Sequence, residues 1–177
     1  MPRVGAAVLK ARYIRGPLLP YGIASTAFGA AGRVWLPPID VPWPVIIDRI
    51  IYQVGATSAG NVRLGLYREG ATADSPAGGV LVVESASVAQ STAYYLQMVT
   101  IAATVLTPGQ YFVGIQGSDD SGTFEWSRDD ASLLSQWYDV AGGYGAFTDP
   151  CPAITKGLIV PFIMLRVKEN LPAGYRL

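Results

Sequence analysis

Apolar residues alternate with polar or small residues along much of the chain, and short turn sequences interrupt the alternation. The sequence VRLGLY at 62–67 places Val62, Leu64 and Leu66 on one face of an extended strand. The stretch at 68–79 that follows it is polar and rich in Gly, Ala and Pro, which predicts a long turn before a second strand. The pattern therefore predicts a strand–turn–strand unit.

Similar strand and turn signals recur over the rest of the chain. Turn sequences lie at 58–61, at 119–122 and at 107–110, where Pro108 and Gly109 fit a type II turn. The glycine- and aromatic-rich stretch at 131–153 predicts a loop, and Pro161 predicts a bulge or an edge position within one long last strand. Further strands are predicted at 45–55, 78–88, 93–106, 111–118, 123–130 and 157–169. With roughly seven to nine strands and no convincing helix, we predict an antiparallel β-sandwich that is jelly-roll-like.

The first 35 residues lack this steady alternation. Several prolines and glycines interrupt them, yet they are too apolar for a typical disordered tail. We therefore predict two parts: an extended N-terminal arm over 1–35, which lies either on this domain or on a neighbouring subunit, and a β-sandwich domain over 36–177. Four prolines between 37 and 44 predict an extended edge segment at the start of the domain.

The chain has 13 basic and 13 acidic residues, but their distribution is uneven. Residues 1–39 contain basic residues and no acid, whereas 117–150 are rich in acids. This complementarity predicts that the arm docks on a neighbouring subunit near its acidic loops, which gives a homo-oligomer. The residues expected to make this contact are Arg3, Lys10, Arg12, Tyr13, Arg15 and Arg33.

Few residues suited to catalysis are present. The chain has no histidine, and its single cysteine, Cys151, is expected to be a small packing residue. Two carboxylates could serve a glycosidase, and the candidates are Asp119, Asp120, Glu125, Asp129 and Asp130. The sequences SDDSG and SRDDAS, which contain the four Asp residues, are typical of loops, where Asp is favoured for local hydrogen bonds. We therefore predict no enzyme activity and no cofactor, while calcium binding by the acidic loops stays open as an alternative.

Aromatic residues gather in the same acidic region. Trp126, Trp137, Tyr138 and Tyr144, with Phe147 nearby, could stack on sugar rings beside carboxylates. The alternative is that these side chains cap the core or fill a subunit contact, because Tyr and Trp are also common at protein interfaces. A carbohydrate site and an interface therefore both remain as interpretations.

Several segments together resemble a known family. The segment VPWPVIIDRIIYQVGATSAGNVRLGLYREG, then GGVLVVESASV, then LTPGQYFVGIQGS resembles a β-sandwich module of tailed-bacteriophage structural proteins. The matching elements are Ile47–Ile50, Arg63–Arg68 and Leu106–Phe112, and the resemblance covers residues 34–118. It implies no catalytic residues. It implies a structural protein of the tail, a fibre or the head surface, with a jelly-roll capsid or decoration protein as an alternative.

This resemblance also sets the expected partners and location. A virion protein assembled in the host cytoplasm would contact copies of itself, other virion proteins and, in some cases, a host-surface glycan. Nucleic acid is not an expected partner, because the basic residues of the arm are sparse among apolar ones. No apolar stretch is long enough to predict membrane insertion.

Overall fold

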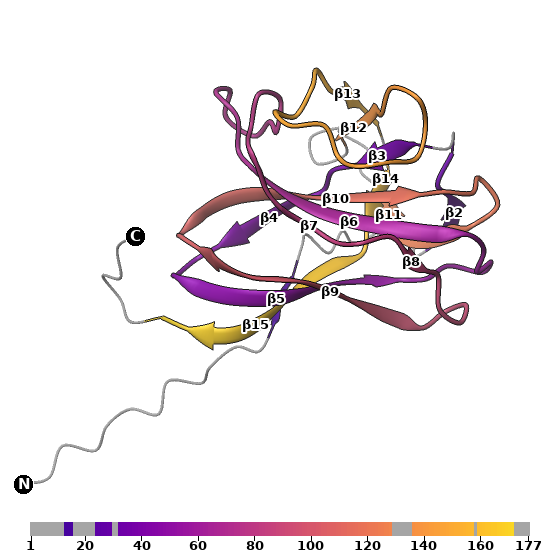
Figure 1. The fold of residues 1–177 in the computed structure, drawn as a ribbon, viewed down its shortest axis with the longest axis horizontal. Coiled ribbons are helices and arrows are strands. Elements are labelled where there is room, and N and C mark those ends of the chain that lie inside the picture. Colours follow the sequence, from indigo (N-terminus) through magenta and orange to yellow (C-terminus); the bar gives the residue numbers. More distant parts are fainter. Residues whose placement is uncertain (1–12, 16–23, 30–31, 129–135, 158, 172–177) are drawn as a thin grey trace, which may run out of the picture.

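The computed structural model describes residues 13–15, 24–29, 32–128, 136–157 and 159–171. In this part of the chain every element is a β-strand, and every strand pair is antiparallel. The predicted antiparallel β-sandwich is therefore confirmed, while the jelly-roll character stays a prediction. Figure 1 shows the strands stacked in layers.

The strands that the structure describes form three sheets. The four-stranded sheet has the order β1 (Tyr13–Arg15), β15 (Ile163–Asn170), β5 (Val45–Gln53) and β9 (Leu96–Leu106). The eight-stranded sheet runs β13 (Thr155–Lys156), β12 (Gln136–Asp139), β3 (Arg33–Trp35), β10 (Gly109–Gly117), β6 (Asn61–Arg68) and β7 (Leu81–Glu84), with β4 (Pro38–Val41) paired to β10 and β8 (Val88–Ala89) to β6. The small sheet runs β14 (Ile159–Pro161), β11 (Thr123–Arg128) and β2 (Ala24–Ala27).

The main core consists of side chains that alternate inward along these strands. Val62, Leu64 and Leu66 of β6 are all completely buried in it, as the alternation predicts. Ile50 of β5 and Leu165 of β15 lie in the same cluster. Burial of these apolar side chains is the main source of stability for the sandwich.

A second, smaller core lies on the other face of the eight-stranded sheet. Tyr67 of β6 and Phe112 of β10 point into it, because neighbouring residues of a strand face opposite sides. Residues 140–151, here called the covering segment, supply Phe147 and Cys151 to this cluster. The eight-stranded sheet is therefore covered by apolar contacts on both faces.

Two glycines make room for the covering segment. A Cβ atom at Gly65 would lie 2.5 Å from the Phe147 ring, and one at Gly114 would lie 3.3 Å from it. Glycine at these positions lets the aromatic ring rest directly on the backbone of β6 and β10. This close approach explains a glycine inside each of two central strands.

The described parts of the expected arm belong to the sheets of the domain. β1 pairs with β15, β2 pairs with β11, and β3 lies between β10 and β12. These segments are extended and find their strand partners within the same chain, which is the first of the two positions expected for the arm, while the division of the chain near residue 35 stays a prediction. Arg3, Lys10 and Arg12 lie outside the described residues.

Three local expectations need correction. The stretch at 131–153 was expected to be a loop, yet it contains strand β12. The last strand is not continuous, because the chain leaves β14 in the small sheet at Pro161 and enters β15 in the four-stranded sheet at Ile163. β14 is an edge strand, as the proline predicted. Gly109 has a φ of 149°, which is not the value of a type II turn.

Candidate functional sites

One basic residue of the expected arm lies among aromatic rings of the same chain. The Arg33 guanidinium lies 3.9 Å from the centre of the Trp137 ring, and its Nε donates to Asp139 at 3.1 Å. Trp35 packs against Trp137 with 6.3 Å between ring centres. The basic and acidic regions thus do meet, but Arg33 and Asp139 meet within one protomer rather than between subunits.

The two other arm residues in the described part lie on β1. Tyr13 stands opposite Arg166 of β15, and Arg15 stands opposite Met164. Both Tyr13 and Arg15 are exposed. They stay available for a partner, although neither forms part of a projecting arm here.

The aromatic residues proposed for a carbohydrate site do not form one groove. Trp126 is half-buried on β11 and packs against the main core, as Trp137 does from β12. Tyr144 is also half-buried, and its hydroxyl shares a 2.6 Å hydrogen bond with the Ser87 hydroxyl. These residues mainly pack against their own chain, which is the alternative left open by the sequence.

Tyr138 faces the second core and cannot contact a glycan. It is buried, and its hydroxyl shares a 2.7 Å hydrogen bond with the Tyr67 hydroxyl. Burial raises the pKa of Tyr138 to about 12. The assignment of Tyr138 to a glycan-binding surface is therefore wrong, because the alternation along β12 turns it inward while its neighbour Trp137 turns the other way.

Asp119 and Glu125, two of the acidic residues that the structure describes in this region, make hydrogen bonds with serine residues. Asp119 accepts hydrogen bonds from the backbone and hydroxyl of Ser121, which lower the pKa of its carboxyl group. Glu125 is buried and accepts from the Ser25 hydroxyl. Among the described residues, no group of three or more Asp, Glu, His or Cys side chains is arranged to hold a metal ion. Asp129 and Asp130 lie outside the described residues.

Cys151 is a packing residue. It is buried in the second core, and burial raises the pKa of its thiol to about 12. Its backbone exchanges hydrogen bonds with the β6–β7 turn, donating to the Gly79 carbonyl at 2.9 Å and accepting from the Gly78 amide at 2.8 Å. Since the thiolate is the reactive form, this thiol is poorly suited to redox or nucleophilic chemistry.

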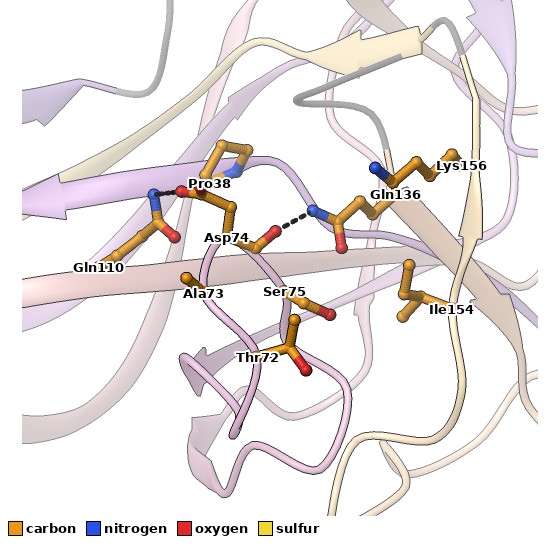
Figure 2. A pocket seen from close by; sticks show the side chains of 9 residues that line it. All are labelled: Pro38, Thr72, Ala73, Asp74, Ser75, Gln110, Gln136, Ile154 and Lys156. Carbon is orange, nitrogen blue, oxygen red and sulfur yellow. Dashed lines mark hydrogen bonds between the residues drawn. The ribbon is translucent and has the colours of Figure 1, made fainter.

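A cavity of about 510 Å³ lies where the β6–β7 turn meets the strands of the eight-stranded sheet. Figure 2 shows Asp74 at its centre, between Gln110 of β10 and Gln136 of β12. The cavity has both polar and apolar walls, and nine residues line it: Pro38, Thr72, Ala73, Asp74, Ser75, Gln110, Gln136, Ile154 and Lys156. Sequence patterns did not indicate this cavity, because its lining comes from five separate regions of the chain.

Asp74 holds the two glutamine side chains of this cavity. Its backbone carbonyl accepts from Gln136 Nε2 at 2.7 Å, and its carboxylate accepts from Gln110 Nε2 at 3.2 Å (Figure 2). Asp74 itself has a φ of 58°, in the left-handed region that is uncommon for residues other than glycine. The Oε1 atoms of Gln110 and Gln136 are both buried and have no hydrogen-bond partner in the structure.

An exposed apolar patch lies at the start of β9. Tyr94, Tyr95, Leu96 and Met98 are between 52% and 66% exposed, and these four residues are here called the β9 patch. β9 lies at the edge of the four-stranded sheet, with β5 as its pairing neighbour. The sequence shows this segment as apolar, but its alternation could not tell which face would be left uncovered.

The comparisons with known proteins add no family assignment. No protein-family model, curated protein or solved structure matches this chain. The resemblance to the bacteriophage module therefore stays a prediction. The described residues contain no helix with the length and apolar character needed to span a membrane.

Proposed function

We propose that this chain is a non-enzymatic structural protein of a tailed-bacteriophage particle, which assembles with copies of itself through the β9 patch. Two observations support the particle assignment. The segments that carry the resemblance fall on β5, on β6 and on the turn from β9 into β10, and β6 and β10 pair directly with each other. In addition, the described side chains are used mainly for packing rather than gathered into a reactive centre.

The β9 patch is the observation that carries the assembly proposal. It exposes four large apolar side chains within five residues, whereas isolated exposed apolar residues are ordinary on soluble proteins. Exposed apolar side chains at a sheet edge are a surface that a protein partner can cover. A second copy that covered them would gain the free energy of apolar burial.

The charge pattern favours a second copy as the occupant. No charged residue occurs between Glu84 and Asp119, so β9 and both turns beside it carry no charge of their own. Two identical patches can therefore approach without like-charge repulsion, and a strongly charged partner finds no complement on this strand. A contact between the β9 patches of two copies related by two-fold symmetry also forms a closed dimer, which does not grow into a filament.

The edge of β9 limits how far strand pairing between copies could extend. The pairing with β5 shifts register between the Ile47–Thr104 and Arg49–Thr100 pairs, which places extra residues of β9 at 101–103. A bulge of this kind interrupts continuous backbone pairing between the edge strands of two copies. We therefore assign the contact to the β9 patch and the first residues of β9, before the bulge.

The native mass of the full chain tests this assembly. Light scattering or sedimentation over a range of concentrations should give a defined oligomer for the natural chain. Met98→Lys should raise the dissociation constant of the oligomer at least tenfold, because a charge would be buried in the contact. The matched control is Val80→Lys in the β6–β7 turn, since Val80 is 60% exposed and lies outside the patch.

Two results would overturn the assembly proposal. A natural chain that is monomeric at all concentrations would remove self-association. An oligomer that resists Met98→Lys would place the contact elsewhere on the chain. Removal of residues 1–33 is a poor test, because it would also delete β1 and β2.

The particle assignment has its own test. Peptides of this chain should be detected, in a fixed ratio to the major structural proteins, in tailed-phage particles purified from the organism that encodes it. Their absence from purified particles, together with their presence in the cell lysate, would contradict a role in the virion.

A further inference from the structure

Two arginines lie side by side on the outer face of the four-stranded sheet. Arg49 of β5 stands opposite Thr100 of β9 on one side and opposite Arg166 of β15 on the other. Cross-strand partners share a face of a sheet. Thr100 is exposed and shares its face of β9 with Leu96 and Met98, because alternate residues of a strand point to the same side. The two arginines therefore lie on the same face as the β9 patch, farther along the strands.

Only one arginine of this pair holds a carboxylate. Arg166 donates to Asp48 from Nε and Nη2, whereas Arg49 pairs with no acid that the structure describes. Lys168 is exposed on the same side as Arg166, because Val167 between them lies in the main core. The hydrogen bonds from Arg166 contribute most to lowering the pKa of Asp48. The charges of Arg49 and Lys168 lower this pKa further, so both cations lie near the same carboxylate. Arg49, Arg166 and Lys168 are here called the basic cluster.

The four-stranded sheet as a whole is positively charged. Its strands carry four basic residues and two acids, a net charge of +2: Arg15, Arg49, Arg166 and Lys168 against Asp48 and Glu169. Like charges on directly opposite residues, such as Arg49 and Arg166, destabilise a sheet on their own. An acidic group from outside the sheet would therefore be favourable beside the basic cluster.

An acidic turn lies at the end of the sandwich where β9 begins (Figure 1). Residues 118–122, here called the acidic turn, join β10 to β11 and contain Asp119, the exposed Asp120 and no basic residue. Gly60 connects this turn to the segment before the β9 patch. Its carbonyl accepts from the Gln90 amide at 3.0 Å, and a Cβ atom on it would lie 2.6 Å from the Asp119 Cβ. The acidic turn and the basic cluster therefore lie on opposite sides of the β9 patch along the strand direction.

These charges distinguish the two ways in which two β9 patches can meet about a two-fold axis. If the two β9 strands ran in the same direction, the two acidic turns would lie close together, and so would the two basic clusters. If they run in opposite directions, the acidic turn of each copy extends past the patch of the other copy toward its basic cluster. Like charges repel and opposite charges attract, so the antiparallel alignment is favoured.

We propose that two copies joined through the β9 patch run antiparallel, with the acidic turn of each copy in contact with the basic cluster of the other. This inference rests on the proposed assembly through the β9 patch. Apolar burial supplies the affinity and the charge contacts set the alignment, because exposed ion pairs add little affinity by themselves. The two-fold symmetry forms the charge contact twice in each dimer.

The experiment measures the dissociation constants of charge-reversed full chains by sedimentation at low ionic strength, where surface charges are least screened. Arg49→Glu and Asp120→Arg should each raise the dissociation constant about fivefold or more, because each places like charges in both contacts of the dimer. Lys168→Glu reverses an exposed member of the same cluster and should act in the same direction. It decides the outcome if Arg49→Glu fails to fold.

Matched controls and a double reversal separate this contact from a general effect of charge. Lys156→Glu and Asp40→Arg reverse exposed charges on β13 and β4 of the eight-stranded sheet, and should leave the dissociation constant within about twofold of the natural value. Arg49→Glu and Asp120→Arg combined in one chain should restore it to within about threefold, because opposite charges again face each other in both contacts. Parallel copies would show no such recovery.

The outcomes separate this inference from the assembly on which it rests. A natural chain that is monomeric would remove both. A natural chain that associates and responds to Met98→Lys, while Arg49→Glu and Lys168→Glu fold and have no effect, would overturn the charge contact alone. Tighter association of Arg49→Glu would show that the copies run parallel. Single reversals that weaken association without compensating each other in the double variant would show that the acidic turn and the basic cluster do not meet.

Discussion

The outer faces of the two main sheets differ in how far the rest of the chain covers them. The eight-stranded sheet is covered by residues 140–151, which add a second core around Tyr67 and Phe147. The four-stranded sheet instead leaves Leu96 and Met98 of β9 exposed at its edge. The comparison teaches that an aromatic-rich segment is not necessarily a binding surface. Here the aromatic residues complete the fold, and the exposed apolar surface lies on a strand that the sequence did not single out.

The largest expected effect comes from the ring at the centre of the covered face. Phe147→Ala should lower the free energy of unfolding by about 3–5 kcal/mol, because it removes a buried ring from above Gly65 and Gly114. Met98→Ala on the exposed side should change it by no more than about 0.5 kcal/mol in the monomer. Urea unfolding at low protein concentration measures both, and equal effects would contradict the difference between the faces.

The glycine beneath this ring gives a second, smaller effect. Gly65→Ala should cost about 1–3 kcal/mol, because the new Cβ would lie 2.5 Å from the Phe147 ring. In a Phe147→Ala background the same substitution should cost much less, since the clash is gone. A double-mutant cycle from urea unfolding measures this coupling. Simple additivity of the two substitutions would show that the ring does not rest on Gly65.

The hydroxyl of Tyr67 should contribute less than the Phe147 ring. It donates to the Thr148 carbonyl at 2.6 Å and shares a hydrogen bond with Tyr138, so Tyr67→Phe leaves these groups short of a partner. The expected cost is about 1–3 kcal/mol by thermal or urea unfolding. Tyr94→Phe, at an exposed tyrosine of the β9 patch, is the control and should have almost no effect on the monomer. A similar small effect for both variants would argue against the buried hydroxyl pair.

The smallest expected effect lies in an ion pair of the four-stranded sheet. Arg166 donates from Nε to Asp48 Oδ1 at 2.8 Å and from Nη2 to Oδ2, and these hydrogen bonds lower the pKa of Asp48 below its ordinary 3.8. A carboxyl group whose pKa is lower in the folded chain than in the unfolded chain stabilises the folded state above pH 3.8. This contribution is lost as the pH falls through the folded-state pKa.

Asp48→Asn should therefore slightly lower stability at pH 7 and flatten its decline between about pH 5 and pH 2. Urea unfolding at a series of pH values measures this dependence. Asp120→Asn, at an exposed acid, is the control for the loss of one carboxylate and should change stability at pH 7 by no more than about 0.5 kcal/mol. Parallel profiles for Asp48→Asn and the natural chain would show that the pair contributes nothing.

Much of the fold could be predicted from the chain alone. The alternation in β6 correctly placed Val62, Leu64 and Leu66 in the main core, and Pro161 correctly indicated an edge strand. The prediction was wrong for β12, because four residues within a glycine-rich stretch carry too little periodicity to indicate a strand. The pattern also did not indicate strands β1, β2 and β3 within the first 35 residues, because three- and four-residue strands are stabilised by their partners rather than by their own pattern.

The candidate sites were harder to predict than the strands. Tyr138 and Trp137 are neighbours in sequence but face opposite sides of β12, so an aromatic cluster in the sequence did not become one surface. The cavity depends on Asp74, Gln110 and Gln136, which lie on a turn and two strands far apart in the chain. Long-range contacts of this kind leave no local signal in a single sequence.

The sequence by itself determined the class of the fold, because the two-residue period of a half-buried strand is a local property of the chain. It also determined that β9 and its flanking turns carry no charge. Only the tertiary structure decided which faces were covered. The covering segment buried one outer face through contacts with Gly65 and Gly114, β9 was left at an edge, and Asp74 oriented two distant glutamines around one cavity. Each of these outcomes depends on which strands become neighbours, and that is set by the packing of the whole chain.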